Sequence, residues 1–275
     1  MKNRTVKLLG LIFALFIVMA CSTIGGGAGE ENTPIEEPAS SVEGGEAPDT
    51  NNNEEASTTE SGLCVNEYYP VVEGGVWNYQ GTSSEAEDYT FSNTITAVRD
   101  DGFSIQVEFD NVTLNQEWAC TPEGILALDV GGGTAGTLTT SDVNLVMVTQ
   151  NSSGITYPNE ITPGDTWTQT LDYTGTMDFG GETTEVSGDT VYNSTAIGVE
   201  SVTVPAGTFD AMKIEVIMTI NIKMNIGGTE MPVTVTTTTL SWFAKDVGWV
   251  KSDSSSNIAG FSTTESIELT SYSIP

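Results

Sequence analysis

The chain of 275 residues carries 38 acidic residues, eight basic residues and no histidine, so its formal net charge is −30. This charge argues against nucleic acid and against anionic lipid head groups as partners, because proteins bind both through Lys and Arg. The lack of histidine excludes Ser-His-Asp and Cys-His nucleophile systems and histidine ligation of a metal. The sequence predicts no cofactor and no metal site.

Residues 1–20 are typical of a bacterial export signal. Three basic residues among the first seven precede an apolar run, residues 8–20, which is too short for a comfortable membrane span. The run ends in "VMAC", which resembles a lipobox. We therefore expect Cys21 to be the lipidated first residue of the mature chain, anchored to a bacterial membrane on its cell-surface or periplasmic side. The alternatives are a secreted protein cut near Ala20 and one short anchor helix.

Residues 21–61 are predicted to form a disordered acidic linker after the lipidated cysteine. Residues 22–61 hold ten acidic residues, no basic residue and no aromatic residue. Such a composition buries too little apolar surface to offset the entropy of ordering, and self-repulsion extends it. Forty flexible residues span on the order of 35 Å. The predicted domains are thus the signal peptide 1–20, the linker 21–61 and a folded domain 62–275.

Two cysteines remain after Cys21, namely Cys64 and Cys120. An even pair in an exported domain most simply forms a disulfide, which here joins the start of the folded domain to an early strand. A loop of this length predicts a stabilisation of about 2–4 kcal/mol. The alternatives are two free thiols or a metal pair.

The folded domain shows strand patterns separated by turn signals and no convincing helical period. The longest pattern is residues 212–226, which alternate so regularly that a strand there reaches about 50 Å. Its apolar face comprises Met212, Ile214, Val216, Met218, Ile220, Ile222 and Met224, followed by Ile226. Strands are also predicted at 166–179, with Trp167, Leu171 and Tyr173 on one face, at 184–199 and 201–204, and at 232–243, with a bulge near Leu240.

Strands this long coil with the twist of the sheet. The fold class predicted is therefore all-β, a single strongly curved antiparallel sheet or open β-barrel with long hairpins.

Three stretches resemble a known group of proteins: "YYPVVEGGVWNY" (68–79), "VTVPAGTFDAMKI" (202–214) and "WFAKDVGWVKS" (242–252). They are similar to signatures of the TapB-like family of uncharacterised exported bacterial lipoprotein domains. The third stretch carries Lys245-Asp246 where that family has Pro-Gly. The resemblance implies a curved antiparallel sheet, loosely similar to periplasmic lipoprotein carriers, and it brings no reaction and no catalytic residues.

Three functions are compatible with this pattern. The first expectation is a non-enzymatic interaction or structural module of the cell envelope, whose apolar face packs into a core and whose surface binds an unknown envelope partner. The alternative is a carrier or binding protein for a lipid or other hydrophobic ligand, held in a concave apolar face. The last is a carboxylate-based glycan hydrolase, which requires two inward carboxylates in a cleft, such as Glu108 or Asp172 with a partner. A cavity lined by Trp167, Leu171, Tyr173 and the even-numbered residues of 212–226 would distinguish the carrier.

Overall fold

The computed structural model describes residues 62–84, 87–109, 112–128, 136–139, 143–179, 182–226, 229–258 and 261–275. The predicted signal peptide, the lipidation of Cys21 and the linker lie outside these ranges and stay predictions. No helix among the described residues is long and apolar enough to cross a membrane.

The described chain forms one antiparallel sheet of 14 strands, which confirms the all-β prediction. The strands are Val76–Ser83 (β1), Tyr89–Arg99 (β2), Gly102–Phe109 (β3), Val112–Thr121 (β4), Gly124–Ala127 (β5), Gly136–Thr139 (β6), Val143–Gly154 (β7), Tyr157–Pro158 (β8), Thr166–Phe179 (β9), Glu182–Val204 (β10), Gly207–Ile226 (β11), Thr229–Ala244 (β12), Gly248–Ile258 (β13) and Phe261–Ser273 (β14). Their order across the sheet is β6-β7-β9-β10-β11-β12-β13-β14-β1-β2-β3-β4-β5-β8. The sequence pattern does not predict β6 and β8, which are short.

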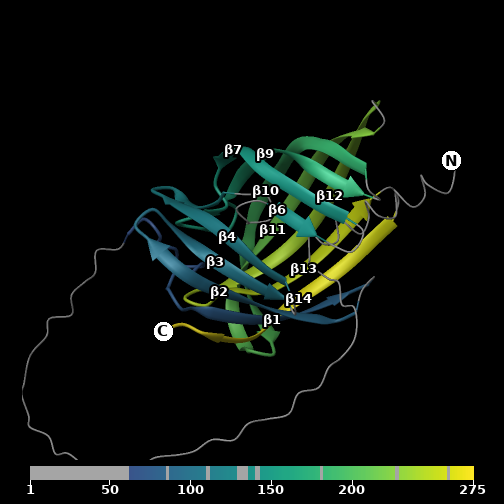
Figure 1. Ribbon diagram of the computed structural model, residues 1–275. Coiled ribbons are helices and arrows are strands. Elements are labelled where there is room, and N and C mark those ends of the chain that lie inside the picture. Colours follow the sequence, from purple (N-terminus) through teal and green to yellow (C-terminus); the bar gives the residue numbers. More distant parts are fainter. Residues whose placement is uncertain are drawn as a thin grey trace, which may run out of the picture.

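The sheet is strongly curved, so that strands β3 and β4 lie in front of β10 and β11 (Figure 1). The long strands responsible are β10 and β11, which pair along nearly their whole length, from Val204 with Gly207 to Val186 with Met224. The two strands predicted at 184–199 and 201–204 are one strand, β10, and only a register shift between Ala196 and Gly198 interrupts its pairing. The prediction of two strands was wrong because a bulge interrupts the alternation of apolar and polar residues in the same way as a turn does. Unlike a turn, a bulge leaves the strand continuous.

A second irregularity lies in β12, where the sequence predicts a bulge near Leu240. The pairing of β12 with β13 shifts register between Trp242 and Phe243, two residues beyond that position. Beyond the shift, β12 and β13 meet in the tight turn from Ala244 to Gly248. The phase change in the sequence therefore indicates a true feature of this hairpin.

The two ends of the sheet meet without pairing as strands. Gly154 at the end of β7 pairs with Gln169 on β9, whereas Tyr157 in β8 pairs with Ile125 on β5, at the opposite end of the strand order. Two residues, 155 and 156, thus carry the chain from one end of the sheet to the other. We call this contact between β5, β9 and residues 155–156 the seam. Among the described residues no ladder joins β5 to β9, so the sheet there is not closed into a barrel.

Two clusters of buried apolar residues lie on the concave side of the part of the sheet that the structure describes. The larger contains residues of β1–β5 and β10–β14 and includes Phe103, Ile125, Val250 and Leu269, each fully buried. The smaller cluster lies beneath the curve of β10–β12 and contains Tyr68, Ile161, Ala196, Met212, Ile214 and Phe243. Both clusters follow from strand alternation, which gives each strand one inward face.

The segment before β1 closes one end of the curve. The predicted disulfide between Cys64 and Cys120 is present and ties this segment to β4. Nearby, the Asn66 Nδ2 donates to the Pro158 carbonyl oxygen at 2.8 Å, and Tyr68 is buried. The Tyr69 ring stacks on the Tyr157 ring with centroids 5.2 Å apart. The segment before β1 is therefore linked covalently to β4 and also packs against β8.

Candidate ligand-binding cavity

The predicted apolar face of residues 212–226 belongs to β11 and faces the inside of the curve. Its ends are core: Met212 and Ile214 are each 1% exposed, and Ile220, Ile222 and Met224 are also buried. Its middle differs, because Val216 and Met218 are only half-buried. The side chain of Ile226 lies outside the described residues.

A cavity of about 290 Å³ lies against this middle part of β11. It brings together five of the predicted residues, Ile214, Val216, Met218, Trp167 and Leu171. The other five, Met212, Ile220, Ile222, Met224 and Tyr173, are buried without lining it. Tyr173 is directed elsewhere, since its hydroxyl donates to the Asn221 carbonyl oxygen at 3.1 Å. The apolar stripe is thus packed at both ends and hollow between them.

The rest of the wall was not predicted from the sequence. It is made by Gln116, Trp118, Ala127, Ile155, Thr156, Tyr157, Gln169, Tyr192, Ser194, Thr239, Ser241 and Phe243, which come from β4, β5, β8, β9, β10, β12 and residues 155–156. One pattern in the sequence could have predicted part of this wall. In "NQEWAC", the alternation places Gln116 and Trp118 on the same face as the half-cystine Cys120, whose partner closes this end of the fold.

The seam fixes one side of the cavity through side-chain hydrogen bonds. The Thr156 hydroxyl donates to Gln169 Oε1 at 2.7 Å and accepts from the Ala127 amide at 2.8 Å. Gln169 Nε2 donates to the Ala127 carbonyl oxygen at 2.8 Å, and Trp167 Nε1 donates to the Thr156 carbonyl oxygen at 2.8 Å. These polar groups satisfy one another, so they present a closed wall to the cavity.

The cavity is electrically neutral. Among the described residues that line it, none carries a formal charge, although residues 62–275 have a formal net charge of −23. Burial raises the pKa of Tyr157 well above its usual value, and the nearby Tyr192 raises it further. The Tyr157 hydroxyl therefore stays protonated across the physiological range. A cavity wall without charged groups favours ligands that do not bring an unpaired charge into it.

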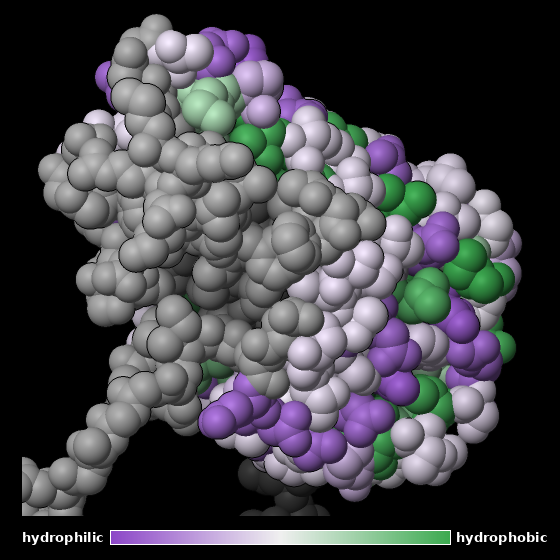
Figure 2. Space-filling view, turned by 90° about the vertical axis from the view of Figure 1, so that its right-hand side faces the viewer, coloured by the Kyte–Doolittle hydropathy of each residue, from purple (hydrophilic) through white to green (hydrophobic). Residues whose placement is uncertain are grey.

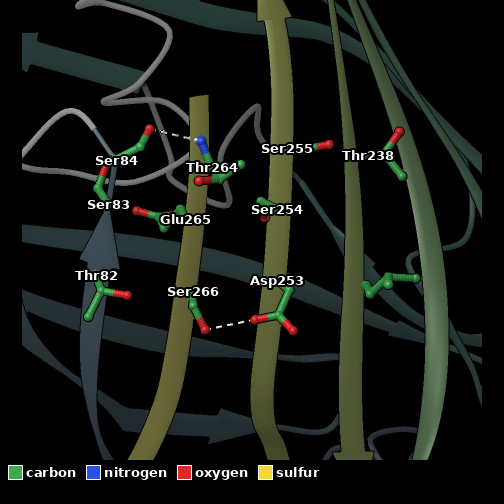
Figure 3. A pocket seen from close by; sticks show the side chains of 11 residues that line it. Thr82, Ser83, Ser84, Thr238, Asp253, Ser254, Ser255, Thr264, Glu265 and Ser266 are labelled. Atoms are coloured by element: carbon green, nitrogen blue, oxygen red, sulfur yellow. Dashed lines mark hydrogen bonds between the residues drawn. The ribbon is translucent and has the colours of Figure 1, made fainter. Parts of the chain in front are cut away.

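A second concavity, about 450 Å³ in volume, lies near the ends of β1, β12, β13 and β14. It is lined by Leu240, by hydroxyl side chains and by two carboxyls, Asp253 and Glu265, which Figure 3 shows on neighbouring strands. Asp253 accepts a hydrogen bond from Ser266 at 2.7 Å, whereas Glu265 accepts one from the Tyr89 hydroxyl at 2.6 Å. Asp253 and Ser266 are register partners and share one face of the sheet. The next residue along, Glu265, therefore belongs to the opposite face, and the two carboxyls do not oppose each other across a cleft.

The carboxylates named for a glycan hydrolase, Glu108 and Asp172, are both exposed. Glu108 lies at an outward position of β3, beside the inward Val107, and Asp172 lies at an outward position of β9, beside the buried Leu171. Neither faces inward into a cleft, so the arrangement described for a two-carboxylate hydrolase is not formed by these two residues.

The outer surface mixes polar and apolar side chains. On the face in Figure 2, hydrophobic residues stand among hydrophilic and weakly polar ones rather than in one broad patch of the described atoms. The exposed large apolar residues include Ile197 and Val199 on β10 and Ile217 on β11. Single exposed apolar residues are usual on protein surfaces. The cavity is therefore the stronger candidate for a binding site.

Fold and cavity together define a class: a curved, antiparallel all-β domain with a small neutral cavity inside its curve. Within that class the chain belongs to the DUF3108-like family, which matches residues 73–262. The family named by resemblance, the TapB-like family, stays a prediction. None of the curated proteins compared with the chain matches it.

Solved structures with a similar arrangement come from three bacteria. A predicted lipoprotein from Parabacteroides distasonis is 15% identical, with a TM-score of 0.44 over 76% of this chain and 99% of that one. An exported protein with a YmcC-like fold from Bacteroides fragilis is also 15% identical, with a TM-score of 0.41 over the same shares. The hypothetical lipoprotein YmcC from Escherichia coli is 9% identical, with a TM-score of 0.32 over 72% of this chain and 84% of that one.

Proposed function

We propose that the domain is an extracytoplasmic, lipid-anchored binding protein that holds a small hydrophobic ligand in the cavity beneath β11. The observation that carries the proposal is the half-burial of Val216 and Met218 in the middle of an otherwise packed stripe, beside a cavity of about 290 Å³. Natural cores are close-packed, so a space of this size lined by apolar and aromatic groups is unusual unless something occupies it.

The chemistry of the wall supports the same function. Met218 is flexible and polarisable, and Trp167 and Phe243 offer large flat surfaces. Such groups adapt to apolar ligands of varied shape, and polar side chains such as Ser194, Thr239 and Ser241 also line the cavity. Pockets for small ligands commonly combine these two features.

The experiment is native mass spectrometry of residues 62–275, purified from cells, before and after extraction with organic solvent. We expect a co-purifying small mass that extraction removes. Met218→Trp, which fills the cavity, should reduce this bound fraction at least fivefold. The matched control is Ile217→Trp on the same strand, where the side chain points outward and is 38% exposed, and this variant should retain the ligand. A clean unliganded mass for the unmodified domain, with no uptake of added lipid, would overturn the proposal.

A second function is favoured by the two ends of the stripe. Met212, Ile214, Ile220, Ile222 and Met224 are packed as core, as expected for a non-enzymatic interaction or structural module of the cell envelope. Under this function the outer surface binds an envelope partner and the cavity is only a packing defect. This second function would be favoured if cells that carry Met218→Trp behave like cells with the unmodified protein and if the unmodified domain shows only its unliganded mass.

The location is part of the proposal. The lipobox-like "VMAC" and the acidic linker support a location outside the cytoplasm, with the domain tethered through lipid on Cys21. Cys21→Ser should move the protein from the membrane fraction to the soluble extracytoplasmic fraction. If Cys21→Ser stays with the membrane, the lipid anchor is wrong, while ligand binding by residues 62–275 can still be measured separately.

A further inference from the structure

The wall of the cavity holds two serine hydroxyls that lack a hydrogen-bond partner. Ser194 on β10 and Ser241 on β12 both line the cavity, and they are only 7% and 9% exposed. Within the part of the chain that the structure describes, no hydrogen bond engages either hydroxyl. Neither Oγ is sealed from solvent in the way that Trp118 Nε1 is, so the small surface that each hydroxyl keeps opens into the cavity.

The pairing of the strands brings both hydroxyls to the hollow part of β11. Ser194 pairs with Val216, and Val216 pairs in turn with Thr239 on β12. Ser241, which is the next inward residue of β12, pairs with Ile214. Short polar side chains therefore flank the half-buried Val216 on both sides, and they leave open a space that larger residues would fill.

Another inward hydroxyl on this face has found a partner, and these two have not. Thr239 and Ser254 share a hydrogen bond of 2.9 Å between β12 and β13. Ser194 has no such neighbour, because its register partners are Trp167 on β9 and Val216 on β11. A buried hydroxyl without a partner has lost its bonds to water, and a ligand that supplies a partner restores this loss.

The positions of the two serines restrict the shape of a ligand that engages both. They lie two strands apart, with β11 between them, and they differ by one inward step along the strands, so their Cα atoms are about 12 Å apart along the sheet. Each hydroxyl can both donate and accept. The apolar side chains of Leu171 and Met218 line the same cavity. A ligand that satisfies both serines therefore needs two separate hydrogen-bonding groups joined by an apolar body.

We propose that the ligand is an amphipathic molecule with an apolar body and two hydroxyl or carbonyl oxygens near its opposite ends, one hydrogen-bonded to Ser194 Oγ and the other to Ser241 Oγ. This proposal rests on the proposed function, because it names the class of ligand for the same cavity. It assigns Ser194 and Ser241 as binding residues. A carrier of plain hydrocarbon chains would leave both hydroxyls unpaired.

The test uses residues 62–275 and three eight-carbon probes, 1,8-octanediol, 1-octanol and 1-octene, each competing with the neutral fluorescent dye N-phenyl-1-naphthylamine. Ser194→Ala and Ser241→Ala should each weaken 1,8-octanediol binding about threefold to tenfold, and the double variant about tenfold to a hundredfold. 1-Octanol can turn to use either serine, so each single variant should weaken its binding less than about threefold. 1-Octene binding should change less than about twofold in every variant, because this probe makes no hydrogen bond.

Ser252→Ala is the matched control. Ser252 is 4% exposed and its hydroxyl also has no partner among the described residues, but it does not line the cavity. This variant should leave 1,8-octanediol binding unchanged. A loss as large as that of Ser241→Ala would show that the loss comes from packing, and it would overturn the proposal. Equal losses for 1,8-octanediol and 1-octene, or no loss for 1,8-octanediol, would overturn it as well.

Thermal unfolding without ligand provides a second readout. The unfolding midpoints of Ser194→Ala and Ser241→Ala should be unchanged or higher, because neither hydroxyl has a partner to lose. A lower midpoint would show that the hydroxyls already contribute to the folded domain, and it would contradict their assignment to a ligand. If the dye does not bind, or binds equally well to Met218→Trp, the proposed function fails together with this inference. If the dye binds but the serine variants behave like the unmodified domain, only the inference fails.

Discussion

Gln169 on β9 bridges to Ala127 on β5, because its Nε2 donates to the Ala127 carbonyl oxygen at 2.8 Å. The two strands lie near opposite ends of the strand order, and no ladder joins them in the part of the chain that the structure describes. Thr156 completes the bridge by bonding to Gln169 Oε1 and to the Ala127 amide. The amide side chain of Gln169, which is 2% exposed, thus supplies the hydrogen bonds that a paired strand would supply in a closed barrel.

Gln169→Leu should therefore destabilise the domain by about 2–4 kcal/mol. Leucine has a similar volume but leaves the Ala127 carbonyl oxygen and the Thr156 hydroxyl without this partner in a buried place. The measurement is urea unfolding followed by tryptophan fluorescence. The matched control is Gln150→Leu, since Gln150 is exposed and its side-chain amide donates to the nearby Val148 carbonyl oxygen, and the change in the free energy of unfolding should stay within about 0.5 kcal/mol. A loss of less than 1 kcal/mol for Gln169→Leu would show that the seam adds little to stability.

Most of the strands could be predicted from the sequence, and the seam could not. The alternation of residues 212–226 identifies both the strand and its inward face, because a period of two is a local property. The seam depends on contacts between residues far apart in sequence, such as Ala127 and Gln169, which no local pattern encodes. One residue did carry a signal: Gln169 occupies an inward position between Trp167 and Leu171, where an apolar side chain is expected. A polar residue in such a place indicates a buried hydrogen-bonding partner.

The cavity was predictable only in part for the same reason. Five residues of its wall come from the two stripes identified by alternation, and the remainder from strands that curvature brings opposite them. Which part of a long apolar stripe is packed and which part is hollow depends on the side chains across the curve. On the facing wall, Trp118 and Gln116 decide this, and they belong to β4, about a hundred residues before β11 in the chain.

Glu265 should make the stability of the domain depend on pH. Burial raises the pKa of this carboxyl from its usual value of 4.5 to about 8. The folded state therefore holds a proton that the unfolded state loses near pH 4.5. The contribution of Glu265 to the free energy of unfolding is greatest below about pH 4.5, and it falls as the pH rises towards 8. The slope is at most about 1.4 kcal/mol per pH unit, and partial exposure limits the total to about 2–4 kcal/mol.

The measurement compares the free energy of unfolding of the unmodified domain with that of Glu265→Gln at pH 5, 6.5 and 8. Glutamine mimics the protonated acid and keeps an acceptor for the Tyr89 hydroxyl. The variant should gain stability relative to the unmodified domain as the pH rises. Glu108→Gln, at an exposed carboxylate, controls for the change in net charge and should show a constant difference. A constant difference for Glu265→Gln as well would mean that Glu265 is ionised throughout this range.

The disulfide should support both the fold and the cavity. Cys64 and Cys120 are 56 residues apart, and replacing both with alanine should lower the free energy of unfolding by about 2–4 kcal/mol. The same change releases the segment that carries Tyr69, whose ring stacks on Tyr157 in the cavity wall. We therefore expect the affinity of the cavity for a neutral hydrophobic dye, such as N-phenyl-1-naphthylamine, to fall together with the free energy of unfolding. Reducing the disulfide of the unmodified domain with dithiothreitol tests the same role without a mutation. An unchanged free energy of unfolding in both experiments would contradict a stabilising role of the disulfide.

The turn at Lys245-Asp246 explains the departure from the Pro-Gly of the TapB-like pattern. Asp246 has φ of 59°, a left-handed conformation that glycine adopts freely and that aspartate tolerates better than most residues. The turn is held by the Val247 amide, which donates to the Ala244 carbonyl oxygen at 3.2 Å, and by the Asp246 amide, which donates to the Glu67 carbonyl oxygen at 3.0 Å. Asp246 thus occupies a position whose backbone conformation favours glycine.

Two substitutions at Asp246 should therefore have opposite effects. Asp246→Gly relieves the backbone and should leave the free energy of unfolding unchanged or raise it by up to about 1 kcal/mol. Asp246→Val places a β-branched residue at positive φ and should lower it by about 1–2 kcal/mol. Both variants remove the same carboxylate, so an electrostatic role for Asp246 would shift them in the same direction. Urea unfolding of the pair distinguishes the two causes: a similar change for glycine and valine would show that charge, and not backbone conformation, decides the residue at this turn.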